Sequence, residues 1–240
     1  MGRTNKRYRK HKRGSRKSRK VSNRMAGGTS NPIVYPPSSI NQYVSNVAYV
    51  NLDSRKDRRA QLEDQLKVFK PEKIHRVPGV ENKQYPYVGG VTAHLNAMKL
   101  AKESNWDNVL ILEDDSIWAN TDVSYPIFEM LVKNPYDVIM LAGTYSDFDK
   151  NTFKINKSKC ASAYLVNKSY YNTIISKTEE ILAQYKPGIT PVDGITLDVA
   201  VFEPLQAVNK WFIVSPSLMI QSKGYSDILQ KQVDYTSEFV

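Results

Sequence analysis

The sequence predicts an α/β domain built around a mixed, mostly parallel β-sheet. From about residue 44 onward, short apolar segments typical of strands alternate with amphipathic segments of about 12–18 residues typical of helices. Hydrophobic residues make up 41% of the 240-residue chain, which is enough to bury a substantial core. No run of about 18 apolar residues occurs, so we expect no membrane-spanning helix. These observations indicate one globular domain.

The basic residues of the chain are concentrated at its beginning. Residues 1–24 hold 12 Lys and Arg and no acidic residue, so 22 basic and 24 acidic residues remain in 25–240, a net charge of −2. A segment with this composition cannot bury enough apolar surface to fold, and a stretch rich in Gly, Pro and Ser follows it. We therefore predict a disordered basic tail and linker over residues 1–43 and a single domain over residues 44–240.

The tail and the single cysteine bear on location and partners. Residues 3–24 could bind a polyanion, such as nucleic acid or an acidic surface, and would also suit a nuclear address or a virion protein. The tail lacks the apolar region of a secretory signal. Cys160 alone cannot form an internal disulfide, and it excludes a thiol-rich zinc site. The sequence thus favours the cytoplasm or another reducing compartment.

Periodicity predicts the elements in order. Residues 46–52 have the pattern of a strand, and Leu62, Leu66 and Phe69 mark the buried face of a helix over 57–69. Ser54 and Asp57 have the spacing of a capping box at the start of this helix. The later predicted strands are 73–77, 108–112, 136–143, 160–167 and 211–215, the later helices are 91–104 and 168–185, and loops 79–90 and 144–158 are expected to select the acceptor.

Three carboxylates directly follow the apolar strand that ends at Leu112. Because ligands of open α/β sheets bind beyond the carboxyl ends of strands, this position favours a binding site. In an extended chain Glu113 and Asp115 would point to one side and Asp114 to the other. Two converging carboxylates suit a hard divalent cation such as Mn²⁺ or Mg²⁺. The alternative is a solvated loop whose acidic residues cap the following helix.

Five separated motifs carry a resemblance to a known family. They are "VAYVNLDSRKDRR", "GVTAHLNAMKLAKESNWDNVLILEDDSI", "ASAYLV", "PVDG" and "PSLMIQSKGYSDI", which span Val47 to Ile228. In this order and spacing they resemble glycosyltransferase family 25, which includes lipooligosaccharide glycosyltransferases and collagen β-galactosyltransferases. The resemblance implies a Rossmann-like GT-A fold, a UDP-sugar donor, and a divalent metal held by an acidic motif.

The resemblance also implies roles for particular residues. The acidic motif matches "EDD", which makes Glu113 and Asp115 metal ligands and places Asp114 at the nucleotide sugar, with Asp227 as a further metal ligand. The residues implied to border the nucleotide are Asn51, Leu52, Arg55, Arg58, Gln221 and Ser226. Arginines at a helix start after a strand are suited to phosphate, although a solvated first helical turn is the alternative.

The catalytic candidates are Asp193, then Asp198, and His94. Asp193 in "PVDG" matches an acidic residue near the acceptor, and an inverting transfer requires a carboxylate to accept the proton of the attacking hydroxyl. A turn aspartate is the alternative for Asp193. His94 has Ala93 before it where the family often has serine, and a semi-buried structural histidine is the alternative for it.

The sequence therefore predicts a metal-dependent, inverting transferase that moves a hexose, galactose or glucose, from a UDP-sugar to a hydroxyl of a glycan or protein. Two other classes remain open. One is a nucleic-acid-binding or metal-dependent nuclease-like protein that uses the basic tail, which the slightly acidic composition of residues 25–240 disfavours. The other is a non-catalytic relative with the same fold, which the intact acidic motif disfavours.

Overall fold

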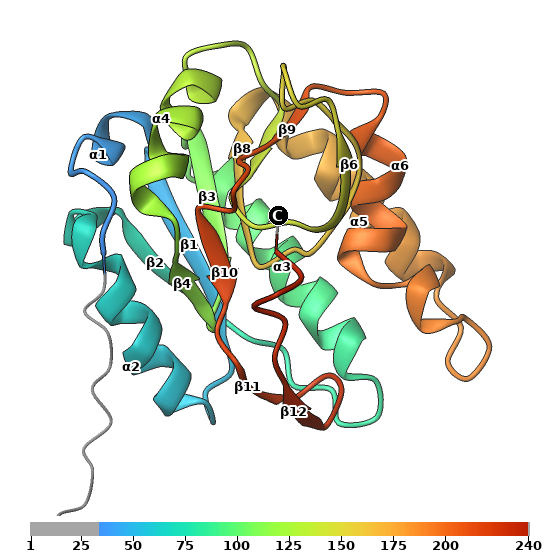
Figure 1. Ribbon diagram of the computed structural model, residues 1–240. Coiled ribbons are helices and arrows are strands. Elements are labelled where there is room, and N and C mark those ends of the chain that lie inside the picture. Colours follow the sequence, from blue (N-terminus) through green and yellow to red (C-terminus); the bar gives the residue numbers. More distant parts are fainter. Residues whose placement is uncertain (1–33, 240) are drawn as a thin grey trace, which may run out of the picture. The chain divides into compact units, whose positions relative to one another are not determined.

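A six-stranded β-sheet forms the centre of the computed structural model, which describes residues 34–239. β8 is antiparallel to both of its neighbours, and every other pair in this sheet is parallel. The predicted fold class, an α/β domain with a mixed, mostly parallel sheet, is therefore confirmed. The strand order is β2 (Ile74–Pro78), β1 (Asn46–Asn51), β3 (Asn108–Glu113), β8 (Ala163–Asn167), β5 (Val138–Met140) and β9 (Trp211–Ile213) (Figure 1).

Helices cover both faces of this sheet. Side chains alternate along β3, so Val109 belongs to the core formed with α3 and α5, whereas Leu110 belongs to the core formed with α1, α2 and α4. Both residues are fully buried, which explains why the strand is apolar throughout. The helix bounds are α1 Ile40–Tyr43, α2 Lys56–Gln65, α3 Pro86–Glu103, α4 Thr121–Val132, α5 Tyr171–Gln184 and α6 Glu203–Gln206.

The predicted strands and long helices are present, but two details of the helices differ. Helix α3 begins at Pro86 rather than at residue 91, so Gly89 and Gly90 lie in the helix and not in a loop. The capping box is wrong, because Arg55 is the residue before α2 and no side chain caps the helix there. Asp57 instead pairs with the Arg55 guanidinium, with 3.0 Å between the nitrogen and oxygen atoms.

Sequence periodicity missed one long helix and several short strands. Helix α4 was not predicted, and loop 144–158 contains most of an antiparallel pair. Strands of three residues are too short to show a period of two, which explains most of these omissions. The additional pairs are β6 (Thr144–Phe148) with β7 (Ile155–Lys159), β4 (Ser116–Trp118) with β10 (Met219–Gln221), and β11 (Gly224–Ser226) with β12 (Lys231–Val233).

Residues 34–43 pack onto the domain, although the sequence assigned them to the linker. Ile40 in α1 has no exposed surface, and the Tyr35 hydroxyl donates a hydrogen bond of 2.9 Å to the carbonyl of Asp64. The folded part therefore includes α1. The predicted basic tail lies outside the described residues.

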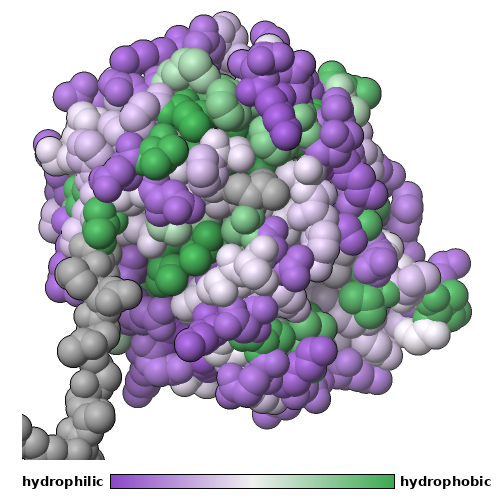
Figure 2. All heavy atoms as spheres, viewed as in Figure 1, coloured by the Kyte–Doolittle hydropathy of each residue, from purple (hydrophilic) through white to green (hydrophobic). Residues whose placement is uncertain are grey.

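The surface of the described residues carries hydrophobic side chains in small groups. Figure 2 shows such groups separated by hydrophilic residues on one face of the molecule. Ile228 and Leu229, which follow β11, are among the exposed hydrophobic residues. No helix within residues 34–239 combines the length and apolar character needed to cross a bilayer.

Candidate functional site

A cavity of about 490 Å³ lies where β1 and β3 end. These two strands are parallel neighbours, so their last residues, Asn51 and Glu113, are brought to the same edge of the sheet. The β11 segment, with Tyr225 and Ser226, forms another part of the wall, and so does the loop before α3. The cavity thus joins four separate parts of the chain.

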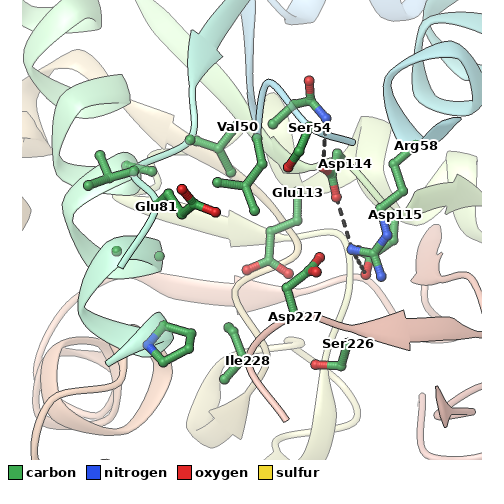
Figure 3. Close-up of a pocket in the computed structure, with 18 of the residues that line it drawn as sticks. Val50, Ser54, Arg58, Glu81, Glu113, Asp114, Asp115, Ser226, Asp227 and Ile228 are labelled. Carbon is green, nitrogen blue, oxygen red and sulfur yellow. Dashed lines mark hydrogen bonds and ion pairs between the residues drawn. The ribbon is translucent and has the colours of Figure 1, made fainter. Parts of the chain in front are cut away.

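All three carboxylates of the acidic cluster line this cavity. Strand β3 ends at Glu113, and the chain turns at Asp114 and Asp115. The predicted alternation, with Asp114 on the opposite side, is therefore wrong, because it assumed that the extended chain continued past Glu113. Figure 3 shows Asp114 and Asp115 on the same side of the cavity, facing the Arg58 guanidinium.

Arg58 bridges the two aspartates. Its Nη1 atom lies 3.0 Å from Asp114 Oδ1 and 3.1 Å from Asp115 Oδ2, and these side chains are only 11–14% exposed. Asn51 Nδ2 donates a further hydrogen bond of 2.8 Å to Asp114 Oδ2. The first turn of α2 therefore supplies the positive charge that partly offsets the acidic cluster.

Glu113 is held from two other directions. Gln221 Nε2 donates to Glu113 Oε2 at 3.0 Å, and His94 Nε2 lies 3.3 Å from Glu113 Oε1. His94 Nδ1 in turn contacts the Tyr164 hydroxyl at 2.8 Å. Because His94 is 3% exposed and does not line the cavity, it supports Glu113 from behind.

One arginine cannot neutralise three neighbouring carboxylates. Burial, followed by the charge of Glu113, raises the pKa of Asp115 to about 7 despite the opposing effect of Arg58. Burial also raises the pKa of Asp114 above its usual value, although Asn51 and Arg58 act in the opposite direction. The cluster therefore carries an excess of negative charge that a bound cation would relieve.

The donor set fits a cation held mainly at Asp115. Its Oδ1 atom is buried and has no hydrogen-bond partner in the part of the chain that the structure describes, although buried polar oxygens are normally satisfied. Asp227 is engaged by Arg55 at 2.5 Å, and both oxygens of Glu113 have partners. No group of three His, Cys, Asp or Glu side chains that could hold a metal occurs within residues 34–239. A cation here would take most of its ligands from a bound anion and water.

The structure brings together most, but not all, of the predicted site residues. Asn51, Leu52, Arg58, Glu113, Asp114, Asp115, Gln221, Ser226 and Asp227 all line the cavity. Arg55 lies behind it and pairs with Asp227 and Asp57. None of the three catalytic candidates lines the cavity: His94 is buried against Glu113, Asp193 is exposed on a 3₁₀ turn, and Asp198 is half-buried in a π-helix, Leu197–Phe202.

Sequence analysis missed part of the wall. Glu81, Asn82 and Lys83 line the same cavity, although the loop that contains them was assigned to acceptor selection. Gly79 and Gly90 are further wall residues. The one available signal for this wall was the pair Gly89 and Gly90 at the start of the predicted helix. Glycine is unfavourable inside helices, so a pair of glycines there indicates a special role.

Comparison with known proteins adds structural similarity only. No family model matches the chain, and no curated protein is similar to it in sequence. Its structure is similar to a glycosyltransferase involved in glycosylation of the major capsid of PBCV-1, with a TM-score of 0.46, 10% identity, and coverage of 77% of this chain and 95% of that chain. It is also similar to HddC from Yersinia pseudotuberculosis, with a TM-score of 0.41, 14% identity, and coverage of 77% and 76%.

A third similar structure is a protein from STIV, with a TM-score of 0.40, 11% identity, and coverage of 78% of this chain and 93% of that chain. At these scores the similarities carry no weight for function. The fold class follows from the sheet topology, and a functional assignment has to rest on the cavity itself.

Replacement of Arg58 by Met is expected to destabilise the protein by about 2–4 kcal/mol at pH 8, because it leaves two buried carboxylates without their cation. The loss should be smaller at pH 5, where Asp115, with a pKa of about 7, is already protonated. Urea unfolding without added metal at both pH values measures this. An equal loss at both pH values would contradict the role assigned to Arg58.

Proposed function

We propose that this protein is a metal-dependent, GT-A-type glycosyltransferase that moves a hexose from a UDP-sugar to a hydroxyl of a glycan or protein. The observation that supports this most directly is the cavity at the carboxyl ends of β1 and β3. There Asp115 and Glu113 line the same cavity; within residues 34–239 the buried Asp115 Oδ1 has no hydrogen-bond partner, and Asp115 Oδ2 lies 3.1 Å from Arg58 Nη1. The five motifs that resemble glycosyltransferase family 25 agree with this proposal.

The proposed site combines an anionic and a cationic part. Asp115 and Glu113 would hold Mn²⁺ or Mg²⁺, with the donor's diphosphate and water as its other ligands. A cation held by these residues would supply positive charge against the charge that develops on the leaving diphosphate. Arg58 lines the same cavity and would turn from Asp114, Asp115 and the Tyr225 carbonyl to the phosphates, because a guanidinium binds phosphate as a planar fork. Asn51 and Leu52, at the end of β1, border the nucleotide.

The proton acceptor in this proposal is Asp198 rather than Asp193. The backbone N–H of Glu113 donates to the carbonyl of Ser162, and the N–H of Cys160 donates to Asp198 Oδ2 at 3.2 Å. The segment between Cys160 and Ser162 therefore links Asp198 to the end of β3. Asp193 has no such connection, since it lies on an exposed turn. Asp198 does not itself line the cavity, so in this proposal the acceptor hydroxyl would have to lie between the cavity and Asp198 to lose its proton to that carboxylate.

A donor screen tests the proposal. Purified protein is expected to release UDP from a UDP-hexose when Mn²⁺ is present and to lose this activity in excess EDTA, because the leaving diphosphate is then without its counter-charge. UDP-galactose and UDP-glucose are the first donors to compare, and GDP-mannose serves as a nucleotide control. Full turnover in EDTA would contradict the metal requirement, and no turnover of any nucleotide sugar would contradict the function.

A further inference from the structure

Three glycines line the cavity, and the fold explains only two of them. A Cβ atom on Gly89 would lie 2.1 Å from the carbonyl oxygen of Val80, and one on Gly79 would lie 2.9 Å from the backbone nitrogen of Leu52. Both distances are too short for any side chain. At these two positions the close approach of neighbouring backbone requires glycine.

Gly90 differs from both. A Cβ atom at this position would meet only Ile228 Cδ1, at 3.9 Å, which is an ordinary van der Waals contact. Gly90 lies inside the 18-residue helix α3 and has no positive φ angle that would favour glycine. Glycine in a helix interior is less stable than alanine. Packing and backbone geometry within the described residues therefore give no reason for glycine here.

The open space beside Gly90 belongs to the cavity. Pro86 and Ala93, one helical turn before and after it, line the same cavity. This side of α3 is therefore a wall from which only small side chains project. The apolar side chains of Val50 and Val80 also line the cavity. Figure 3 shows α3 on the side of Glu81, and α2 with Arg58 on the opposite side, with Glu113 and Asp227 between them. The cavity therefore has a wall of α3 with few projecting side chains, bordered by Val50, Val80 and the polar loop residues 81–83, and a charged part at Arg58 and the acidic cluster.

We propose that Gly90 determines which ligands fit, because a planar heterocycle, the base of a nucleoside diphosphate, lies against the helix backbone where a side chain would otherwise project. This inference rests on the proposed function and adds the residue that sets the space for the base. A flat ring contacts a wall without side chains over its whole face, whereas a side chain at position 90 would occupy the same volume. The diphosphate would then extend toward Arg58 and the acidic cluster.

The test separates the base from the diphosphate by using two probes. Binding of UDP and of inorganic pyrophosphate is measured by calorimetry in the presence of Mn²⁺ for the parent and for Gly90→Leu. We expect the affinity for UDP to fall at least about tenfold, as an overpacked site costs affinity, while the affinity for pyrophosphate changes less than about twofold. Asn96→Leu is the matched control, because Asn96 is an exposed residue of the same helix that does not line the cavity.

Gly90→Ala protects the test against a folding failure. The added methyl group has room, so the melting temperature should rise by about 2–4 °C, while UDP binding should weaken about threefold. If the parent transfers sugar and both variants bind UDP as tightly as the parent does, Gly90 does not set the space for the base. In that case only this inference is wrong. If the parent binds no nucleoside diphosphate, both the inference and the proposed function are wrong.

Discussion

Replacement of Asp115 by Asn is expected to reduce Mn²⁺-dependent turnover of UDP-hexose by about 10²–10³-fold. The substitution keeps the size of the side chain but removes the buried carboxylate whose Oδ1 atom has no hydrogen-bond partner within residues 34–239. Loss of one negatively charged ligand should weaken both cation and donor binding, so excess Mn²⁺ is expected to restore part of the activity. Turnover against Mn²⁺ concentration, together with UDP affinity, measures these effects.

The same substitution should not cost stability at alkaline pH. The pKa of Asp115 is raised to about 7 in the folded protein, so this residue binds a proton more tightly when folded than when unfolded. Its contribution to stability is therefore lost as the pH rises toward and through 7. Without metal, Asp115→Asn should be at least as stable as the parent at pH 8, whereas at pH 5 it should have no such advantage.

A control at the opposite end of the same strand separates the site from the scaffold. Asp107 precedes β3, is largely exposed, and pairs weakly with Lys168 at 4.0 Å. Asp107→Asn should change neither turnover nor the metal requirement. If Asp115→Asn binds Mn²⁺ and UDP as tightly as the parent, the acidic cluster does not serve as a cation site and its excess charge needs another explanation.

The strand and its acidic end were predictable because both depend on local sequence. Val109 to Leu112 form a continuous apolar run, which is typical of a strand buried on both faces. The carboxylates begin where that burial ends. The turn at Asp114 was not predictable, because no glycine or proline marks it. Periodicity describes a regular chain, and it says nothing about the residue at which the chain leaves the sheet.

Contacts between distant segments account for most of what sequence could not reveal. Arg58 and Asp114 are 56 positions apart, and Arg55 and Asp227 are 172 apart. A basic first turn of a helix has the same pattern whether its arginines face water, phosphate or a carboxylate of the same chain. The pairing of Arg58 with buried aspartates depends on the tertiary arrangement of α2 and β3, which local sequence does not encode.

Two backbone N–H groups hold the Asp198 carboxylate in place. Its Oδ2 atom accepts from the N–H of Cys160 at 3.2 Å and its Oδ1 atom from the N–H of Val199 at 3.0 Å, and the residue is half-buried. Cys160 cannot compete as a nucleophile near neutral pH, because burial and the charge of Glu113 raise the pKa of its thiol to about 12.

Replacement of Asp198 by Asn is therefore expected to lower sugar transfer by about 10²–10⁴-fold while the affinity for the UDP-sugar stays within about twofold. The amide cannot accept the proton of the acceptor hydroxyl, but it leaves the acidic cluster and Arg58 untouched, and added Mn²⁺ should not rescue it. Asp193→Asn is the matched comparison and should transfer at close to the parent rate, because Asp193 lies on an exposed turn. Single-turnover transfer and equilibrium donor binding distinguish the two. If Asp193→Asn is the inactive variant and Asp198→Asn is not, the exposed turn must move to the cavity during catalysis, and the proton acceptor assigned here is wrong.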